Sequence, residues 1–444
     1  MQTNSSIIKQ VGRSRGGANP GHFKNTADFE TMVMPAPKYV VIAMQQHIGA
    51  PCVPCVSKGD PVFVGTVIGD SERFVSAPIH SSVSGMVAEI GSLLLPSGQS
   101  CQTVKIESDG LMTLDPEIAP VKVTNEKELC EATRRSGLVG LGGAGFPAHV
   151  KLHKTEDKPL DTLIINGAEC EPFITSDYRE CIENSNDVLE GVYLLKKIMG
   201  FKNVIIGIED NKPDAIRILR QIAQDRQDTN NSVNVMKLKS RYPQGAEKVL
   251  IYSATGRLLP FGKLPADVGC VVMNITSVAF LNRYIKTGIP LISKRLTIDG
   301  SAVVTPGNVM VPIGVSIKEV LDFCGGLNCE PQKVLMGGPM MGLAVLDLNT
   351  PVLKQNNAIL AFNKDDSVLP ESSPCIRCGR CAKACPMNLM PAAIETSLKL
   401  DMPEELKSKN VSYCIECGCC SYVCPAKRPL TQNMRLAKAK LRNL

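Results

Sequence analysis

The chain has 444 residues, of which 44% are hydrophobic and 21% charged, and its formal net charge is +6. This length predicts about three or four domains, and the composition is that of an ordinary globular protein. No uninterrupted apolar run of 18 residues occurs, so we expect no membrane-spanning helix. The first 20 residues lack the apolar stretch of a secretory signal, which indicates a cytoplasmic protein.

The positive charge is concentrated at the C-terminus, because residues 426–444 hold six cations and no acid. Such a tail could lie on an anionic membrane surface or on an acidic partner, or it could be a solvated polar end. Nucleic-acid binding is not expected. The chain has no tryptophan, few other aromatic residues and no stripe of interleaved basic and aromatic side chains.

From about Thr31 to Ile106, short β-branched runs alternate with turns, which predicts a small β domain. Segments 58–65 and 76–87 resemble the barrel-sandwich hybrid of biotinyl and lipoyl carriers. The lysine that such carriers modify is absent, and His80-Ser81-Ser82-Val83 stands in its place. We therefore expect a structural or docking module instead of a swinging arm.

Helix and strand patterns then alternate between residues 125 and 238, which predicts a mostly parallel sheet. The expected helices are 126–135, 187–199 and 214–223, and the expected strands are 162–166, 203–208 and 234–238.

A third pattern, from residue 291 to residue 326, predicts a β-grasp-like unit in which strands precede one helix. The expected strands are 295–298, 302–304 and 309–311. Ser316 and Glu319 form a capping box that opens a helix over 317–324, and Gly325-Gly326 ends it.

Near the C-terminus, the pattern Cys-x2-Cys-x2-Cys-x3-Cys-Pro occurs twice, as in bacterial two-cluster ferredoxins. Three cysteines of one motif bind three corners of a [4Fe-4S] cubane, and the fourth ligand comes from the other motif. The predicted sets are Cys375, Cys378, Cys381 with Cys424, and Cys414, Cys417, Cys420 with Cys385. Zinc is the alternative, but zinc sites usually use two separated Cys-x2-Cys pairs. The other ten cysteines show no disulfide framework, which suits a reducing interior.

Five glycines lie within the nine residues from Gly137 to Gly145, which suggests that backbone N–H groups approach a phosphate or a flat ring there. Lys151 follows and could meet an anion, although a glycine-rich loop is also typical of a tight connection. Asn166-Gly-Ala-Glu-Cys-Glu-Pro172 comes directly after an expected strand, where α/β sheets bind ligands. Its amide and two carboxylates can hydrogen-bond a flavin or a ribose.

These two segments together resemble the NADH-binding flavoprotein subunit of respiratory complex I, and so do residues 242–247 and 274–277. The domain order, with residues 336–342 and 417–430, resembles the RnfC subunit of the Rnf electron-transport complex over roughly residues 16–440. Leu141 and Ala246 depart from the complex I pattern, which has an arginine and a glutamate there, and Ala18-Asn19 interrupts the usual Gly-Gly-x-His entry.

The resemblance implies a multidomain α/β and α+β protein. Its expected parts are a docking tail (1–30), a barrel-sandwich hybrid (31–120), a Rossmann-like FMN- and NAD(H)-binding domain (121–290), a β-grasp SLBB-like domain (291–358) and a two-[4Fe-4S] ferredoxin-like helical domain with the basic tail (359–444). The implied FMN residues are Gly140, Gly142, Gly143, Gly145, Lys151, Asn166, Glu169, Gly245, Asn274 and Ser277. Phe146, Glu171 and Glu247 would face NAD(H).

The implied function is that of the NAD(H)-reacting subunit of a membrane-bound ferredoxin:NAD+ oxidoreductase. Non-covalent FMN would convert hydride transfer into single electrons, which two [4Fe-4S] clusters carry. Implied partners are membrane subunits that move Na+ or H+ and a ferredoxin-like iron-sulfur subunit, with the chain peripheral on the cytoplasmic face of the bacterial inner membrane. The alternatives are a soluble cobalamin reductase of the propanediol-utilisation type and a non-catalytic electron-relay scaffold, and Lys151, Glu169 and Asn274 argue against the scaffold.

Overall fold

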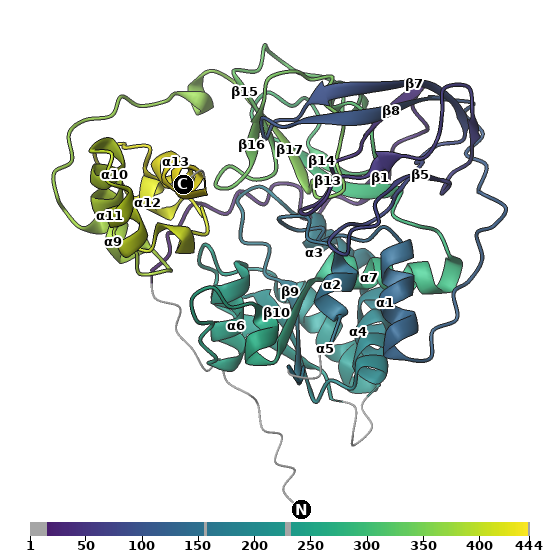
Figure 1. Cartoon of the computed structure of the whole chain (residues 1–444), viewed down its shortest axis with the longest axis horizontal. Coiled ribbons are helices and arrows are strands. Elements are labelled where there is room, and N and C mark those ends of the chain that lie inside the picture. The colour runs from purple at the N-terminus through teal and green to yellow at the C-terminus, as the bar shows by residue number, and fades with distance from the viewer. Residues whose placement is uncertain (1–15, 155–157, 227–231, 443–444) are drawn as a thin grey trace, which may run out of the picture.

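The computed structural model of the chain describes residues 16–154, 158–226 and 232–442. Figure 1 shows an α/β unit in the lower part of the view, β-rich units above it and a helical unit at the left that contains the C-terminus. Sequence expectations for residues 1–15 lie outside the described residues.

The N-terminal β unit consists of two small antiparallel sheets whose buried faces meet. Their orders are β2-β8-β7-β4 and β3-β5-β6. The strands are β2 (Tyr39–Ala43), β3 (Val53–Pro54), β4 (Pro61–Val62), β5 (Val67–Asp70), β6 (Ile79–His80), β7 (Gly85–Leu94) and β8 (Ser100–Ser108). Val40 and Ile42 of β2 point into a core with Ile68, Val104 and Ile106, as the period of two in a half-buried strand requires.

The α/β unit contains the predicted parallel sheet, in the order β11-β10-β9-β12. Its strands are β9 (Thr162–Gly167), β10 (Asn203–Glu209), β11 (Asn234–Leu238) and β12 (Cys270–Asn274). Its helices are α1 (Glu126–Arg135), α2 (Ala148–Leu152), α3 (Ser176–Glu183), α4 (Ser185–Met199), α5 (Pro213–Asp225), α6 (Glu247–Thr255) and α7 (Ile275–Thr287), with a 3-10 turn η1 (Pro265–Val268).

Both faces of this sheet are covered, which explains its continuous apolar strands. Leu163 and Ile165 of β9 belong to the core shared with α4 and α7, whereas Ile164 belongs to a second core with Leu250 and Ile251 of α6. Helices therefore flank the sheet on both sides and leave the carboxyl ends of β9 and β12 free to carry a site.

A six-stranded sheet, in the order β1-β14-β13-β17-β15-β16, forms the second β-rich unit. Its elements are β1 (Thr31–Val33), β13 (Ser293–Asp299), β14 (Gly307–Pro312), β15 (Lys333–Met336), β16 (Leu343–Val345) and β17 (Ala358–Phe362), with helix α8 (Ile317–Phe323). The capping box is confirmed, because Glu319 N donates to Ser316 Oγ at 3.2 Å and Ser316 N donates to Glu319 Oε2 at 3.3 Å. The sheet extends past the expected boundary at residue 358.

The strand expected at residues 302–304 is wrong. Ala302 and Val303 form a turn after Gly300, whose φ of +114° redirects the chain, and Val303 makes only an isolated bridge to Leu327. Distant segments complete the sheet instead: β1 pairs in parallel with β14, and β17 pairs in parallel with β13. Local sequence could not show these pairings, because the paired strands lie far apart in the chain.

The C-terminal unit packs short helices around the two cysteine motifs. They are α9 (Arg380–Ala384), α10 (Pro391–Lys399), α11 (Pro403–Ser408), α12 (Cys419–Tyr422) and α13 (Leu430–Arg442), with 3-10 turns η2 (Asp365–Ser367) before them and η3 (Val411–Tyr413) among them. Ile394, Leu406, Val411, Met434 and Ala437 form its small core.

Four of the six cations of the basic tail pair with acids of this unit. Arg428 makes two 2.7 Å bonds to Glu395, and Arg435 bonds Glu416 at 3.0 Å. Lys438 also pairs with Glu416, and Lys440 pairs with Asp401. Since α13 also buries Met434 and Ala437, these four cations stabilise the helical unit.

Residues 16–33, which we call the strap, run between the units and tie them together (Figure 1). Gly17 N donates to Ala384 O at 2.8 Å, Ala18 forms an antiparallel bridge with Tyr242, and Phe173 N donates to His22 O at 3.0 Å. The strap ends in β1, inside the six-stranded sheet. The described part of the expected docking tail is therefore bound to its own chain.

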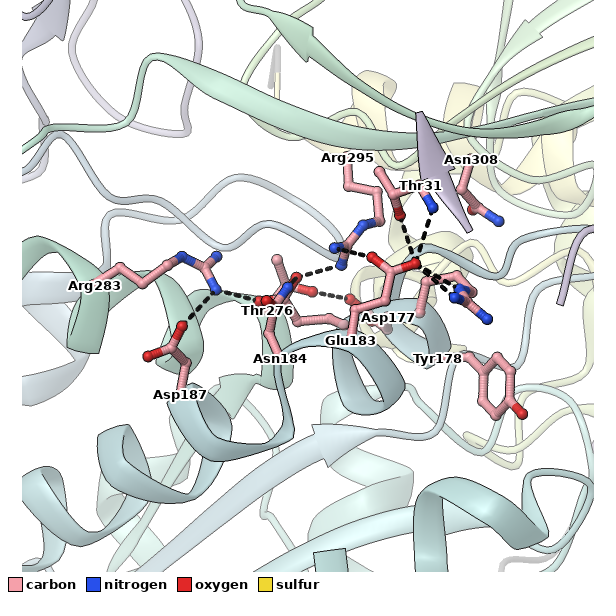
Figure 2. Close-up of polar contacts among 12 residues, drawn as sticks. Thr31, Asp177, Tyr178, Glu183, Asn184, Asp187, Thr276, Arg283, Arg295 and Asn308 are labelled. Atoms are coloured by element: carbon pink, nitrogen blue, oxygen red, sulfur yellow. Dashed lines mark hydrogen bonds and ion pairs between the residues drawn. The ribbon is translucent and has the colours of Figure 1, made fainter. Parts of the chain in front are cut away.

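Helix α3 joins the α/β unit to the six-stranded sheet through buried ion pairs (Figure 2). Arg295 of β13 bonds Glu180 and Glu183, the latter at 2.8 Å, and Arg283 of α7 bonds Glu180 at 2.6 Å. The main-chain N of Thr31 donates to Glu183 at 2.9 Å. Because removing one partner from a buried ion pair leaves the other charge uncompensated, this network fixes how the two units meet.

The hairpin that replaces the modified lysine of carrier domains lies in an interface. His80, Ser81, Ser82 and Val83 are all buried, and Ser82 Oγ donates to Ile313 O at 2.6 Å. This burial is consistent with the predicted structural role and leaves no room for a swinging arm.

Candidate functional site

The glycine-rich loop lies between α1 and α2 and is fixed at Leu141. Leu141 N donates to Ser277 Oγ at 3.2 Å, and Leu141 O accepts from the buried ammonium of Lys294 at 2.5 Å. Gly140 N donates to Phe146 O at 2.9 Å and closes the loop. Residues 142–144 are left exposed at the tip. The loop is thus held at its base and open at its tip.

The glycines of this loop serve different purposes. A Cβ atom at Gly142 would lie 2.4 Å from Asn274 Nδ2, so the chain's own amide requires that glycine. A Cβ atom at Gly143 would meet nothing within 4 Å. Gly145 has a φ of +66°, a conformation that favours glycine. Gly143 is therefore the position at which backbone remains accessible to a ligand.

Asn274 caps α7 and links it to α3. Its Oδ1 accepts from Thr276 N at 3.0 Å and from Ser277 N at 3.3 Å, and its Nδ2 donates to Asp177 Oδ2 at 2.7 Å. Asp177 also accepts from Thr276 Oγ1 at 2.6 Å. Asp177 was not predicted, because it belongs to no local pattern and reaches Asn274 only through the fold.

Asn166 is the next-to-last residue of β9 and holds the segment that contains Gly245. Its Nδ2 donates to Gly245 O at 2.8 Å, and its Oδ1 accepts from Ala168 N at 3.2 Å. Gly245 N in turn donates to Cys170 Sγ at 3.4 Å. The structure therefore brings together two segments that were predicted separately, at the edge of the sheet where α/β folds bind ligands.

The two glutamates that follow Asn166 point to different partners. Glu169, whose φ is +48°, accepts from Asp177 N at 2.6 Å and Tyr178 N at 3.2 Å, and burial raises its pKa to about 7. Glu171 accepts from Tyr242 Oη and from Met340 N, both at 3.1 Å. Burial also raises the pKa of Glu171. Both carboxylates are therefore used within the chain.

Lys151 and Glu247, expected on FMN and on NAD(H), bind each other. Lys151 Nζ lies 2.9 Å from Glu247 Oε1 and donates to Val272 O at 3.1 Å. Both side chains are partly exposed, so solvent screens this pair and either group can turn to a ligand.

Two lysines that were not predicted as site residues lie beneath the 168–174 loop. Lys24 of the strap donates to the carbonyls of Glu169, Glu171 and Ile174 at 2.9, 2.8 and 2.5 Å. Lys212 donates to Ala168 O at 2.7 Å. Burial, and secondarily the charge of Lys212, lower the pKa of Lys24 to about 8. These ammonium groups hold the carbonyls of a loop that contains two positive-φ residues.

The residues around the glycine-rich loop and the 166–172 segment fit a polar ligand such as FMN. Within the described part of the chain, Gln355 Oε1 and Gln244 Nε2 are buried without a hydrogen-bond partner. Gln355 lies against Gly145, and Gln244 directly precedes Gly245. Buried polar atoms are normally paired, so these two groups are suited to a bound molecule.

The second cysteine motif lines a small cavity. The cavity is lined by all four cysteines of the second predicted set, Cys414, Cys417, Cys420 and the crossed ligand Cys385. Glu416 N donates to Cys414 Sγ at 3.3 Å, and Leu389 N donates to Cys385 Sγ at 3.4 Å. This set of four cysteines fits a [4Fe-4S] cluster, and backbone N–H groups donate to two of the cysteine sulfurs.

The first motif lies beside the segment that contains its predicted crossed ligand. Cys381 packs against a buried cluster that includes Cys424, and Ser373 N donates to Ala426 O at 3.0 Å. Cys375 and Cys378 are exposed. Across the described ranges, no three acidic, histidine or cysteine side chains converge tightly enough for one metal ion.

Four family models match consecutive parts of the chain. They are the RnfC barrel sandwich hybrid domain at residues 12–111, the Nuo51 FMN-binding domain at 133–283, the SLBB domain at 295–344 and a 4Fe-4S dicluster domain at 367–425. Their order is the one expected from the sequence.

Curated relatives match nearly the whole chain. The RnfC-type subunit of the proton-translocating ferredoxin:NAD(+) oxidoreductase complex of Clostridium ljungdahlii is 45% identical, over 96% of this chain and 94% of the relative. The corresponding subunit of the Na(+)-translocating complex of Acetobacterium woodii is 42% identical, over 97% of each chain. The chain belongs to the RnfC family of Rnf-complex subunits. Membership settles the domain composition, including the FMN-binding and iron-sulfur domains.

A solved structure shares part of this RnfC fold. A chain of the NAD+-reducing [NiFe]-hydrogenase in its H2-reduced state aligns with a TM-score of 0.50 and 16% identity. The alignment covers 71% of this chain and 62% of the hydrogenase chain. At this identity the likeness concerns the fold alone.

In this member of the RnfC family, the second cysteine loop packs directly on the candidate flavin segments. Cys417 and Cys419 share a buried cluster with Tyr242 and Ala18, against which Cys170 and Met340 pack. A Cβ atom at Gly418 would lie 2.9 Å from Met340 O. The loop therefore reaches the α/β unit, the strap and the six-stranded sheet at one point.

Proposed function

We propose that this chain is the NAD(H)-reacting subunit of an Rnf-type ferredoxin:NAD+ oxidoreductase. Bound FMN would supply the exchange between two-electron hydride transfer and the one-electron steps of two [4Fe-4S] clusters. The observation that carries the proposal is the packing of the Cys417–Cys420 loop on Tyr242 and Cys170, beside the segments of Asn166 and Gly245. Hydride site and relay thus lie on one polypeptide.

Different residues of the chain would bind the phosphate, the flavin ring and the nucleotide. Gly143 and its neighbours offer backbone N–H groups at an open tip, and Lys151 offers a cation to a phosphate. Asn166 and Glu169 would hold the flavin side of the pocket, on a loop whose carbonyls at Ala168 and Glu169 accept from Lys212 and Lys24. Phe146 and Glu247 would face the nucleotide.

The two cysteine motifs have similar backbone conformations but different surroundings. This difference indicates which cluster would lie nearer the flavin pocket. Gly379 and Gly418 occupy the same motif position with φ values of +71° and +81°. A Cβ atom at Gly379 would meet nothing within 4 Å, whereas one at Gly418 would press on Met340. The second cluster is therefore the one next to the flavin pocket, and the first is the one that meets the partner.

The face around the first motif suits an acidic iron-sulfur partner. Ile376, between Cys375 and Cys378, is 67% exposed, whereas its counterpart Ile415 packs into the flavin-side cluster. Arg377, Arg380 and Lys383 are exposed on the same segment. A carboxylate-rimmed ferredoxin-like subunit would complement this face in charge and would bring its cluster near the first one.

We place the subunit on the cytoplasmic face of the cell membrane, held there by its partners. No helix within the described residues is long and apolar enough to cross a bilayer. The chain has nearly the same sequence identity to a subunit of a proton-translocating complex (45%) and to a subunit of a Na(+)-translocating complex (42%). The membrane subunits would therefore determine which ion is moved.

The deciding experiment uses the full chain loaded with FMN and iron under anaerobic conditions. It should transfer electrons from NADH to ferricyanide, and in membrane fractions it should be released by salt or chaotrope. Activity without membrane association, with electron delivery to a corrinoid, would favour the cobalamin reductase alternative. If the chain holds its full content of FMN and iron but reduces no acceptor, the result would favour the non-catalytic electron-relay scaffold.

A variant of Gly143 tests the pocket. Because a Cβ atom there meets no protein atom within 4 Å, Gly143→Val should fold normally and lose FMN. The measurements are FMN content by fluorescence after gel filtration and the thermal unfolding midpoint. Gly91→Val is the control, since Gly91 lies in the carrier-like domain outside the positive-φ region and a Cβ atom there would meet only the side-chain ends of Glu89 and Thr103, at 3.3 and 3.4 Å. Wild-type flavin content in the Gly143 variant would reject the pocket.

A further inference from the structure

Tyr242 lies between the candidate flavin pocket and the second cysteine loop and contacts both. It is 3% exposed and belongs to the segment between β11 and α6 that also carries Gly245. Its hydroxyl donates to Glu171 Oε1 at 3.1 Å. Its side chain is buried in the same cluster as Cys417 and Cys419.

The main chain of Tyr242 is held by the strap and by the second cysteine loop. Its carbonyl accepts from Ala18 N at 2.8 Å and from Cys419 Sγ at 3.8 Å, and its N donates to Ala18 O at 3.2 Å. The strap therefore holds Tyr242 against the cysteine loop, and Tyr242 cannot shift without disturbing both.

Glu171 extends this contact to the six-stranded sheet. Its second oxygen accepts from Met340 N at 3.1 Å, and Met340 O is the atom on which a Cβ atom at Gly418 would press. Tyr242 and Met340 thus hold the Cys417–Cys420 loop from two sides, and Glu171 joins them. Hydrogen-bonded groups in such a buried network fix one another's positions.

We propose that Tyr242 is a positioning residue for electron exchange between the flavin pocket and the second cluster. The inference rests on the proposed function: FMN held by the pocket residues would exchange single electrons with a cluster held by Cys414, Cys417, Cys420 and Cys385. Electron tunnelling weakens steeply with distance and with unfilled gaps. The tyrosine ring fills the space between Glu171 and the cysteine loop, and its hydroxyl fixes their separation.

Two substitutions separate the ring from the hydroxyl. Tyr242→Phe removes only the bond to Glu171, and Tyr242→Leu also removes packing against Cys417 and Cys419. The control is Tyr39→Phe, which breaks an exposed tyrosine–glutamate bond, 3.0 Å to Glu107, in the carrier-like domain.

The experiment is anaerobic stopped-flow reduction of the FMN- and iron-loaded full chain by NADH, with flavin bleaching and cluster reduction followed separately. We expect flavin bleaching to change less than cluster reduction in the Tyr242 variants and to keep the wild-type rate in Tyr39→Phe. Cluster reduction should slow several-fold in Tyr242→Leu, less in Tyr242→Phe, and not in Tyr39→Phe. FMN content, iron content and the low-temperature EPR spectrum of the reduced clusters should match wild type.

Wild-type cluster reduction in Tyr242→Leu, with full cofactor content, would overturn the proposal. Equal slowing of both steps, together with a lower unfolding midpoint, would overturn it as well, because that result describes a general packing defect. If the unaltered chain does not oxidise NADH, the proposed function fails. The flavin is then photoreduced instead, and the same order of the variants in cluster reduction is required.

Discussion

The two motif glycines allow a matched test of how the second cysteine loop docks. Gly379 and Gly418 have similar positive φ values, so alanine at either site meets a comparable left-handed strain of about 1–2 kcal/mol. Only at Gly418 would the new Cβ atom lie 2.9 Å from a carbonyl oxygen, that of Met340. Backbone on both sides of this contact must move to accept the methyl group.

The difference in unfolding midpoint between the two variants therefore reports how tightly the Cys417–Cys420 loop packs against Met340. Overpacking a tight contact costs about 1–3 kcal/mol, and this cost falls on Gly418→Ala alone. For a unit of this size, each kcal/mol lowers the unfolding midpoint by roughly 4–8 °C. Gly418→Ala should thus unfold at a clearly lower temperature than Gly379→Ala.

The assay is the temperature at which the iron-loaded chain loses its visible cluster absorbance. Cluster loss is irreversible, so all variants are heated at one rate. NADH-driven cluster reduction should also slow in Gly418→Ala and stay at the wild-type rate in Gly379→Ala. Equal midpoints for the two variants, or a larger effect at Gly379, would refute the docking described for Met340.

Two further results are expected. Cys424→Ala should lose the first cluster and keep the second, and Cys385→Ala should do the reverse; EPR and iron content check this, and loss of the cluster nearer in sequence would reject crossed ligation. Burial lowers the pKa of Lys354 from 10.5 to about 7, so between these values the unfolded chain holds a proton that the folded chain has released, and stability rises with pH. Lys354→Met should flatten that rise in the unfolding midpoint, whereas Lys318→Met, at an exposed lysine, should leave it unchanged.

Several features followed from the sequence because their physical cause is local. The cysteine spacing predicted two crossed ligand sets, and the structure places Cys385 in one cavity with Cys414, Cys417 and Cys420, while the crossed ligation itself stays a prediction. The alternation of helices and strands predicted the parallel sheet, and Ser316 with Glu319 predicted the start of α8. The glycine-rich loop and Asn166 were recognised by residue type and by their place beside a strand.

Only the tertiary structure decided how these parts meet. Nothing near Lys24 in the sequence indicates that it holds carbonyls about 150 residues away, and Tyr242 reaches Glu171 and Cys419 only through the fold. The two cysteine motifs look alike as sequence, yet one loop is buried against Met340 and the other is open. A local pattern records the bonds that a segment makes with its neighbours in the chain. The burial of that segment depends on surfaces contributed by distant residues, and these leave no trace in the local pattern.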